Sequence, residues 1–531
     1  MKTKLFILFI ALVASADTMF AWDYEHVQID ELYYNLDTTN NFAEVSYQLY
    51  ESTKNYLGLT SVEIPSSVIY EDSIFTVTSI GDYAFRYCKS MTSIEIPNSI
   101  TNIGVCAFKW CDGLTSIDVP NSVKNIGAGA FSCCEKLTSF VLPDSVTSIA
   151  VDLLRQCPKL TSVTLNNNVT NIEDFAFYGD NALVEINIPD SLISIGNWAF
   201  TSCSRLPSLT LPNTVTSIGK GAFLSCFALT SINIPNKVTI IEEETFSYCC
   251  RLTSMVIPGG VKHIGEKAFS FCTALTSITI PNSVDTIGNN AFETCRNLPS
   301  VVIPDGVKSL GKYAFSCCDS LTNVTLSKDL TSISEHTFRE CKKLTSIVIP
   351  DSVRTIEYAA FTLCTGLASV SLPDSLISIG NSAFSYCSKL TSINIPDNVK
   401  SIESGAFYDC TRLSSVSIGS SVTNIEDNAF NYCKKLTNIT NHASTPQVIV
   451  ENVFTNVNKS ACTLYVPDES LILYQTADVW KDFLIQPLSA IPTSLENIDN
   501  ENVRDVKILR DGQIFILRGD KVYTLQGQEV K

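Results

Sequence analysis

The sequence predicts a solenoid of the α/β class, built by stacking many short coils along one axis. A phenylalanine recurs every 23 residues from Phe85 to Phe430, with Leu154 as the one substitution, so that sixteen copies follow each other without an insertion. Within each copy the apolar residues are spaced as L-x-x-L-x-L, for example in residues 114–119. A fixed period of about 20–29 residues with this spacing is the signature of a leucine-rich repeat. No single repeat can bury its own apolar side, so the stack of sixteen coils is itself the fold.

Each copy divides into the same elements. The segment Leu-Thr-Ser-Ile-x-Ile predicts a strand whose leucine and isoleucines point inward. Pro-Asn-Ser or Pro-Asp-Ser then turns the chain, because proline fixes φ and the polar side chains bond their own backbone. A second extended stretch, Val-x-x-Ile, leads to Gly or Glu and then to Ala-Phe-x-x-Cys, which we interpret as a helical or 3₁₀ turn with the phenylalanine inside. The expected array is β-rich and capped at both ends, and a parallel β-helix without curvature is the alternative.

The first residues are typical of an export signal. Two lysines precede the apolar residues 5–13, and residues 14–16 (Ala-Ser-Ala) fit the small-residue rule for cleavage. Cleavage after Ala21 is the alternative. The apolar run is too short to span a bilayer, and no later segment reaches about 18 apolar residues. We therefore expect residues 1–21 to be a signal peptide, and the mature protein to be secreted or held at the bacterial cell surface without a transmembrane segment.

Both ends of the array depart from the repeat. Residues 22–58 place β-rich runs on either side of the turn-forming residues 37–41, which predicts an N-terminal β-hairpin cap over the first coil. The solenoid is expected to occupy residues 59–440. The remaining parts are a C-terminal capping coil at 441–485 anchored by Tyr474, Trp480 and Phe483, a linker at 486–502, and a small β tail at 503–531 with Asp-Gly and Gly-Asp turns.

Twenty cysteines in an exported chain would normally indicate disulfides. Fifteen of them, however, lie three residues after the repeat phenylalanine position, and only Asp180 interrupts this row. Coils in register stack about 4.8 Å apart, which fits poorly to the Cβ spacing and dihedral that a disulfide requires. We therefore predict a ladder of buried thiols, in which cysteine acts as a small hydrophobe. The prediction is weaker for the cysteines outside the row, namely Cys106, Cys133, Cys250, Cys317 and Cys462.

Composition and motifs exclude several functions. The net charge is −17 and no cluster of lysine and arginine occurs, so we expect no nucleic-acid partner. The four histidines have no metal-ligand spacing, and the sequence contains no H-E-x-x-H, no G-x-S-x-G and no glycine-rich phosphate loop. We therefore predict a protein that is not an enzyme and that uses no cofactor and no metal.

Candidate binding residues are those at outward positions of the predicted strand, where packing of the core does not determine the residue type. Outward positions alternate with the inward leucine and isoleucines of the predicted strand, and the position ten residues after the phenylalanine varies most. Long solenoid faces suit distributed contacts with a partner. The candidates on this face, toward the N-terminal end, are Glu95, Asp118, Glu185, Asn187 and Asn233. A second candidate is the aromatic row two residues after the phenylalanine, with Tyr87, Trp110, Tyr248 and Phe271, whose rings either stack on sugars or pack between neighbouring turns.

These copies, in the form L-T-S-I-x-I-P-x-S-V-x-x-I-G-x-x-A-F-x-x-C, resemble the BspA-like leucine-rich-repeat family of surface proteins over residues 59–467. The resemblance implies a secreted or cell-surface binding protein, associated with adhesion to host matrix proteins, cell-surface proteins or glycans, and it implies no catalytic residues. Residues 503–531 resemble a C-terminal sorting domain of the type IX secretion route. The alternative function is a structural or antigenic surface protein without a specific ligand. The ligand and the oligomeric state stay open.

Overall fold

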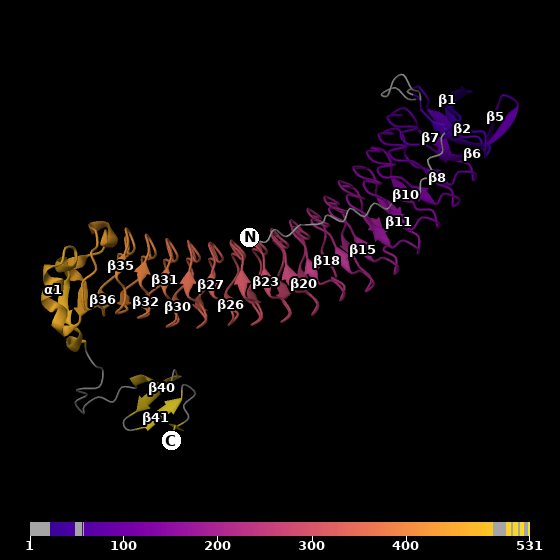
Figure 1. Ribbon diagram of the computed structural model, residues 1–531. Helices are drawn as coiled ribbons and strands as arrows, with labels where there is room; N and C mark the ends of the chain where they lie inside the picture. Colours follow the sequence, from indigo (N-terminus) through magenta and orange to yellow (C-terminus); the bar gives the residue numbers. More distant parts are fainter. Residues whose placement is uncertain are drawn as a thin grey trace, which may run out of the picture.

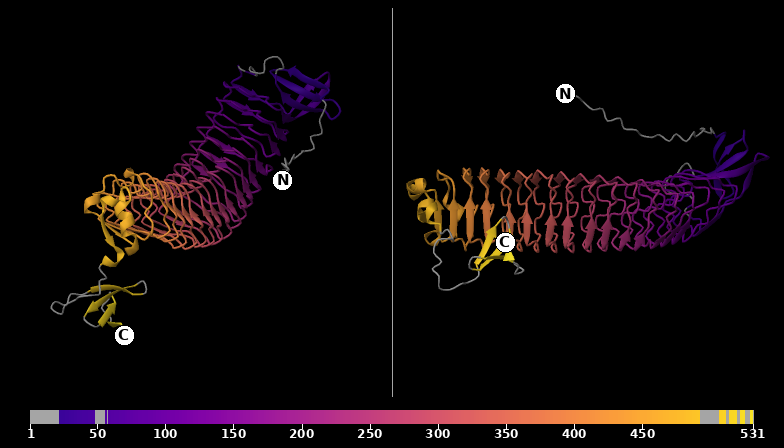
Figure 2. Two further views of the ribbon diagram at one scale, coloured as in Figure 1. Left: turned by 60° about the vertical axis from the view of Figure 1, so that its left-hand side comes forward. Right: turned by 90° about the horizontal axis from the view of Figure 1, so that it is seen from below.

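The computed structural model describes residues 22–47, 56 and 58–491, together with the backbone of four strands between residues 506 and 530. Figure 1 shows the coils stacked one on another into a single rod that bends along its length, with strands β1 to β6 at one end and helix α1 at the other. The views in Figure 2 show the same stack from two further sides. The predicted solenoid is confirmed, and its curvature separates it from the straight β-helix.

The first ladder is a row of parallel strands, one per coil, formed by the Ser-Ile-x part of the repeat. Partners lie 23 residues apart in the regular array, for example Ser139 opposite Ser162. Eighteen described strands make up this ladder, so the stack extends beyond the sixteen regular copies at both ends. They are β4 (Ser61–Glu63), β7 (Ser93–Glu95), β10 (Ser139–Val141), β12 (Ser162–Thr164), β14 (Glu185–Ile186), β16 (Ser208–Leu209), β18 (Ser231–Ile232), β20 (Ser254–Val256), β22 (Ser277–Thr279), β24 (Ser300–Val302), β26 (Asn323–Thr325), β28 (Ser346–Val348), β30 (Ser369–Ser371), β32 (Ser392–Ile395), β34 (Ser415–Ile418), β36 (Asn438–Asn441), β37 (Thr463–Val466) and β38 (Leu484–Pro487).

The second ladder is formed by the Val-x-x-Ile part of the repeat, where each coil contributes two paired residues and the isoleucine points inward. These short parallel strands continue from the N-terminal sheet through β6. They are β8 (Asn102–Ile103), β9 (Asn125–Ile126), β11 (Ser148–Ile149), β13 (Asn171–Ile172), β15 (Ser194–Ile195), β17 (Ser217–Ile218), β19 (Ile240–Ile241), β21 (His263–Ile264), β23 (Thr286–Ile287), β25 (Ser309–Leu310), β27 (Ser332–Ile333), β29 (Thr355–Ile356), β31 (Ser378–Ile379), β33 (Ser401–Ile402) and β35 (Asn424–Ile425).

The turn around the repeat phenylalanine is not helical, and in this detail the sequence prediction was wrong. The residues two before and two after the phenylalanine position have a left-handed backbone in all sixteen copies, as at Tyr83 (φ 60°) and Tyr87 (φ 66°) around Phe85. A helix needs consecutive right-handed residues, so this alternation excludes it. Each left-handed residue other than glycine costs about 1 kcal/mol or more, which the surrounding structure must offset.

Hydrogen bonds between coils provide that offset. The N–H groups of Tyr83, Phe85 and Tyr87 donate to carbonyls of the next coil, at 2.9, 2.8 and 2.9 Å. The same three bonds recur in every regular coil up to that of Phe407. All of them point toward the following coil, because left-handed and right-handed residues alternate. The turn is therefore a third hydrogen-bonded ladder, and it adds three contacts per coil to the two β-ladders.

The residue four before the phenylalanine position is glycine or glutamate in fourteen of the sixteen copies, with Ala150 and Ser334 as the exceptions, and the preference has a geometric reason. At Gly196 a Cβ would lie only 2.5 Å from the backbone nitrogen of Asp174 in the preceding coil. Here the Asp174 Oδ1 accepts the N–H of Asn197 at 2.6 Å. In other coils a glutamate replaces the glycine and satisfies the equivalent N–H from the opposite side, since Glu403 Oε2 accepts the N–H of Asn381 at 3.0 Å. An aspartate of the preceding coil and a glutamate of the following coil are thus two alternative acceptors for the same backbone donor.

The core is a column of stacked phenylalanine rings. Neighbouring rings from Phe85 to Phe454 lie 5.0–5.8 Å apart between centroids, and the repeat phenylalanines are fully buried. Leu154 breaks the column. The missing ring volume is supplied by Phe140, which takes the place of an inward isoleucine and packs 5.1 Å from Phe131 in a tilted orientation. Interior volume is therefore conserved at the break, as close packing of protein cores requires.

The predicted thiol ladder is confirmed. All twenty cysteines are free, and the fifteen in the row are buried. From Cys111 to Cys433 each ladder thiol donates to the carbonyl of the phenylalanine 26 residues earlier, for example Cys111 Sγ to Phe85 O at 3.1 Å and Cys433 Sγ to Phe407 O at 3.3 Å. Cysteine suits this place because it is small and apolar and still has a weak S–H donor.

The N-terminal end is closed by antiparallel strands. β1 (Tyr24–Ile29), β2 (Leu32–Asp37) and β3 (Phe42–Ser46) pair in that order, and β3 then pairs in parallel with β6 (Ser73–Ile80). This sheet covers the edge of the second ladder. β5 (Ser67–Tyr70) forms a hairpin with β6, in which Glu71 and Asp72 are both left-handed, as a two-residue type I′ turn requires.

The C-terminal end is closed by short helices. Trp480 and Tyr474 are fully buried there, and Trp480 donates its indole N–H to Gln447 O at 2.9 Å. These helices are η1 (Glu451–Phe454), η2 (Lys459–Ala461), η3 (Asp468–Ser470), α1 (Leu471–Thr476), η4 (Trp480–Asp482) and η5 (Leu488–Ala490). The tail forms an antiparallel sheet of β39 (Val506–Arg510), β40 (Gln513–Arg518), β41 (Lys521–Thr524) and β42 (Glu529–Val530).

Candidate functional site

The acidic candidates lie on the first ladder and are exposed. Glu95 ends β7 and stands directly opposite Glu63 of β4 in the parallel register. Asp118 follows in the next coil, in a segment without strand structure, and Glu185 begins β14 three coils further on. Glu63, Glu95 and Asp118 therefore form one acidic column at the N-terminal end, which we call the acidic column, while Glu185 lies about 14 Å further along the stack.

The two amide candidates, Asn187 and Asn233, bind the backbone of the preceding coil through their side chains. Asn187 accepts the N–H of Leu165 at 2.7 Å and donates to the carbonyl of Leu165 at 2.8 Å. Asn233 makes the same pair of bonds with Leu211, at 2.7 and 2.8 Å. In neighbouring coils the corresponding backbone N–H bonds to a strand carbonyl, so these side chains replace a missing strand contact. Asn187 and Asn233 hold adjacent coils together and do not join the acidic column.

The aromatic candidates stack in pairs between adjacent coils. The rings of Tyr87 and Trp110 are parallel within 2° at 4.5 Å, and those of Tyr248 and Phe271 are parallel within 5° at 4.5 Å. Packing between turns therefore uses one face of each ring. The first pair also carries cationic groups, since the Arg86 guanidinium lies 5.0 Å from the Trp110 ring centre. Such contacts each contribute about 0.5–1 kcal/mol at exposed sites.

A groove begins where this aromatic row is interrupted. After Trp110 the next four coils place only small or flexible side chains two residues after the phenylalanine position, on the same left-handed backbone. The resulting groove has a volume of about 460 Å³. Its lining residues are Trp110, Cys133, Glu135, Gln156, Pro158, Tyr178, Gly179, Asn181 and Ser202. Of the predicted site residues, only Trp110 belongs to it. We did not predict this groove from the sequence, although the change from rings to small residues in this row is a signal that could have indicated it.

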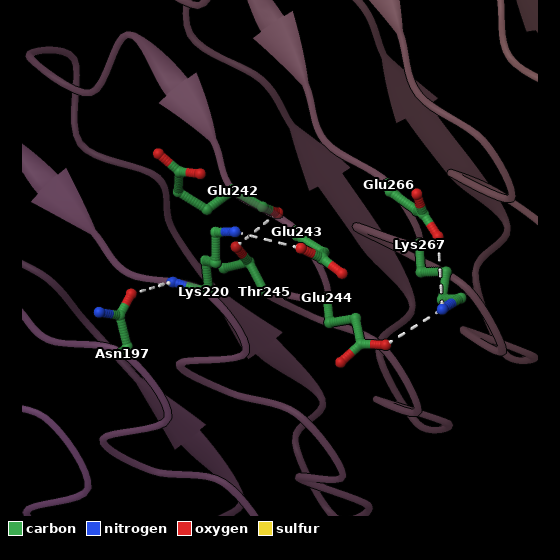
Figure 3. A network of polar contacts seen from close by, with 8 residues as sticks. All are labelled: Asn197, Lys220, Glu242, Glu243, Glu244, Thr245, Glu266 and Lys267. Carbon is green, nitrogen blue, oxygen red and sulfur yellow. Dashed lines mark hydrogen bonds and ion pairs between the residues drawn. The ribbon is translucent and has the colours of Figure 1, made fainter. Parts of the chain in front are cut away.

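Charged side chains also meet on the turn side of the middle coils. Lys220 pairs with Glu243 at 3.2 Å, and Lys267 lies 3.4 Å from both Glu244 and Glu266 (Figure 3). The side chains of these lysines are 39–51% exposed, so each pair contributes at most about 1 kcal/mol. These ion pairs stabilise the contact between neighbouring coils at the surface. Their charges do not converge on one point, so they do not form a binding site for an ion.

The buried thiols, and the half-buried Cys106 and Cys250, are unsuited to nucleophilic chemistry at neutral pH. Burial raises the pKa of Cys226 and Cys364 to about 12, and it also raises the pKa of the half-buried Cys106 and Cys250. A thiol must ionise before it attacks a substrate or binds a metal. Within residues 22–47 and 58–491, no group of three histidine, cysteine or acidic side chains is arranged to hold a metal ion.

The repeats match a family model, the BspA type leucine-rich repeat region, in overlapping segments at 78–185, 170–295, 239–367 and 331–461. Together these segments span residues 78–461, well over half of the chain. The chain belongs to the BspA-type leucine-rich-repeat family. This finding confirms the family that the repeat resembles. No curated protein matches the chain.

One solved structure shows the same fold. A leucine-rich repeat protein from Bacteroides ovatus ATCC 8483 is 28% identical with a TM-score of 0.55, covering 78% of this chain and 94% of that one. A leucine rich cell surface protein from Faecalibacterium prausnitzii A2-165 is 24% identical with a TM-score of 0.33, covering 78% and 94%. In the described part of this BspA-type chain, no helix is long and apolar enough to cross a membrane.

Proposed function

We propose that this protein is a secreted or cell-surface binding protein of the adhesin type, which recognises host or microbial surface proteins or glycans through the solenoid surface. The BspA-type family and the export-like N-terminal sequence support a location outside the cell or at its surface. The observation that favours binding is the long first ladder, whose outward row is free of core constraints. Val256, Val302 and Val348 on this row are 62–70% exposed and alternate with threonines, so the row offers small apolar and hydroxyl contacts to a partner.

A long face of this kind suits many weak contacts. The outward side chains repeat at about 4.8 Å along the stack, so a partner that is itself extended or repeated can bind several coils at once. Within this face, the acidic column is our proposed contact for a protein partner with basic residues, because opposite charge speeds association and selects partners.

The binding proposal is tested with the mature chain. Immobilised matrix proteins, glycans and intact bacterial cells are probed by surface plasmon resonance or cell-binding assays. A saturable interaction with a member of this panel is the expected result. Failure to bind any member would instead favour the structural or antigenic surface protein.

The tail is proposed to direct delivery to the surface. Residues 503–531 resemble a type IX sorting domain, and their strands form the antiparallel sheet β39–β42. Deleting residues 503–531 in the native host is expected to leave the protein inside the envelope, as measured by protease accessibility of intact cells. Normal surface display of the shortened chain would contradict the sorting role. The predicted signal peptide, residues 1–21, lies outside the described residues.

A further inference from the structure

A second groove lies on the turn side of the later coils, and every residue that lines it is uncharged. Its volume is about 410 Å³, within the range of about 300–1,000 Å³ that is usual for ligand sites. The lining residues, which define what we call the tyrosine groove, are Ser382, Ser385, Tyr386, Ser404, Gly405, Tyr408, Asn428 and Asn431. The lining thus combines hydroxyl, phenol and carboxamide groups and contains no aliphatic side chain.

The hollow exists because Gly405 has no side chain. Gly405 stands two residues before a repeat phenylalanine and has the left-handed backbone of that row (φ 62°). A Cβ added to it would make only ordinary van der Waals contacts, at 3.4 Å from Ser382 Oγ and 3.7 Å from Tyr408 Cβ. Other coils carry an aromatic ring at this position on the same backbone, for example Phe175 and Tyr313. The glycine therefore leaves open a space that the fold allows a ring to fill.

Ser385 supplies a buried hydroxyl to this groove. The residue is only 4% exposed, and within the described structure its side chain takes part in no hydrogen bond. In another coil the corresponding hydroxyl is satisfied internally, since Thr362 Oγ1 donates to Ser382 O at 2.6 Å. A buried polar group without a partner costs free energy, and a ligand that bonds to it removes that cost. The Ser385 hydroxyl is therefore a preformed contact for a polar ligand.

The two tyrosines offer rings that are not covered by cations. The rings of Tyr386 and Tyr408 meet at 68° and those of Tyr408 and Tyr432 at 62°, so they do not stack in parallel. Tyr386 is 40% exposed. Among the described residues no lysine or arginine lies over the ring of Tyr386 or Tyr408. Lys434 lies 5.3 Å from the ring centre of Tyr432, which is not a lining residue.

We propose that the tyrosine groove binds a neutral glycan. Sugar hydroxyls donate and accept hydrogen bonds, and the hydroxyls and carboxamides of the lining do the same. Tyrosine adds an apolar ring for the C–H face of a sugar and a polar phenol beside it. An anionic sugar finds no cation in the lining with which to form a charge-assisted hydrogen bond. A peptide fits less well, because the groove has no aliphatic pocket for its side chains.

The size of the groove restricts the ligand further. The lining spans three neighbouring coils, which corresponds to about 10 Å along the stack. This length fits a short segment of an oligosaccharide better than a single sugar. The charged neighbours in these coils, among them Glu403, Asp409 and Arg412, are not part of the lining. The proposal deepens the proposed function by naming a ligand class, and it rests on that function for access to extracellular glycans.

The test uses the mature chain in isothermal titration calorimetry with three neutral probes, cellotriose, mannotriose and chitotriose, and with a neutral glycine–serine peptide. We expect at least one of the oligosaccharides to bind and the peptide not to bind. Ser385→Ala should lower the affinity about fivefold by removing one hydrogen bond, and Tyr386→Ala about tenfold by removing a ring. Gly405→Tyr should abolish binding, because the new ring fills the groove.

Gly129→Tyr is the matched control. Gly129 has the same position in the repeat and the same backbone (φ 63°), but it lies twelve coils away from Gly405. Both variants place a tyrosine on a left-handed backbone, so any loss of stability is shared, and circular dichroism should show the same fold for both. The affinity of Gly129→Tyr should equal that of the wild type.

The proposal is overturned when no oligosaccharide binds at millimolar concentration, when the peptide binds in their place, or when Ser385→Ala and Gly405→Tyr bind as the wild type does. If the surface-binding assays with matrix proteins and cells still succeed in any of these cases, only the groove assignment falls and the proposed function stands.

Discussion

Replacing Asp180 by cysteine is expected to stabilise the protein, and more strongly at neutral than at acidic pH. Asp180 occupies the place of a ladder cysteine and is fully buried. Its Oδ1 accepts the N–H of Cys157 at 2.7 Å, while its Oδ2 has no hydrogen-bond partner in the described structure. Burial raises the pKa of this carboxyl well above its ordinary value of 3.8, because the anion would lose its water.

The size of the effect follows from proton linkage. Above pH 3.8 the unfolded chain releases the Asp180 proton while the folded chain keeps it, so the unfolded state binds fewer protons. The free energy of unfolding therefore falls by about 1.4 kcal/mol for each pH unit up to the raised pKa. The loss accumulates over every pH unit between 3.8 and the raised pKa of the folded carboxyl. A cysteine thiol is neutral in both states over this range and avoids the loss.

The assay is urea denaturation followed by circular dichroism, in reducing buffer, at pH 4 and at pH 7. Asp180→Cys should match the wild type within about 1 kcal/mol at pH 4 and exceed it at pH 7, by about 1.4 kcal/mol for each pH unit over which the folded Asp180 carboxyl stays protonated. Asp180→Asn is the control, since it keeps an acceptor for the Cys157 N–H and removes the titration. An advantage of Asp180→Cys that is equal at both pH values, or a variant less stable than the wild type at pH 7, would refute the reasoning.

Three further outcomes follow from the structure. Phe269→Ala should destabilise the protein by about 3–5 kcal/mol in urea denaturation, because it removes a ring from the buried column, while the exposed Tyr248→Ala should cost much less. Thiol titration of never-reduced protein should find nearly all cysteines free after denaturation and only the half-buried ones reactive in the native state; a majority in disulfides would contradict the ladder. Changing Glu95 and Asp118 together to lysine should weaken binding of a basic protein partner, and unchanged affinity in a folded variant would move the contact away from the acidic column.

The repeat predicted the core because its apolar positions have a fixed period. Phe85, Cys88 and the inward isoleucines recur in register, and stacking in register is the one arrangement that buries them all. The left-handed turn was not predictable in the same way. Glycine marks it in only four copies, at Gly129, Gly179, Gly221 and Gly405, while residues such as Trp110 adopt the same backbone elsewhere. Bonds between coils impose this conformation against local preference, and local sequence does not reveal them.

The candidate site was predictable only in part, for a related reason. Alternation along the strand identified Glu95 as exposed, because exposure follows from the period of two. It could not show that Asn187 binds the backbone of Leu165, since that contact joins residues 22 apart in different coils. The groove was missed because it arises from the absence of large side chains between Trp110 and Tyr178. A hollow surface becomes visible only once the neighbouring coils are placed beside each other.

A stack of nearly identical coils presents the same surface at every step, so any specific contact must come from departures from the repeat. Such departures are restricted, because a residue that changes the core volume must be compensated within the same gap, as Phe140 compensates Leu154. The outward rows have no such restriction and can vary freely. On the strand face, the acidic column lies at the N-terminal end, whereas the valine-bearing row of β20 to β28 varies little. On the turn side, the tyrosine groove depends on Gly405, in a row where most other coils carry a larger side chain. Specific recognition is therefore better placed at such departures, and the coils between them are suited to extend a uniform face.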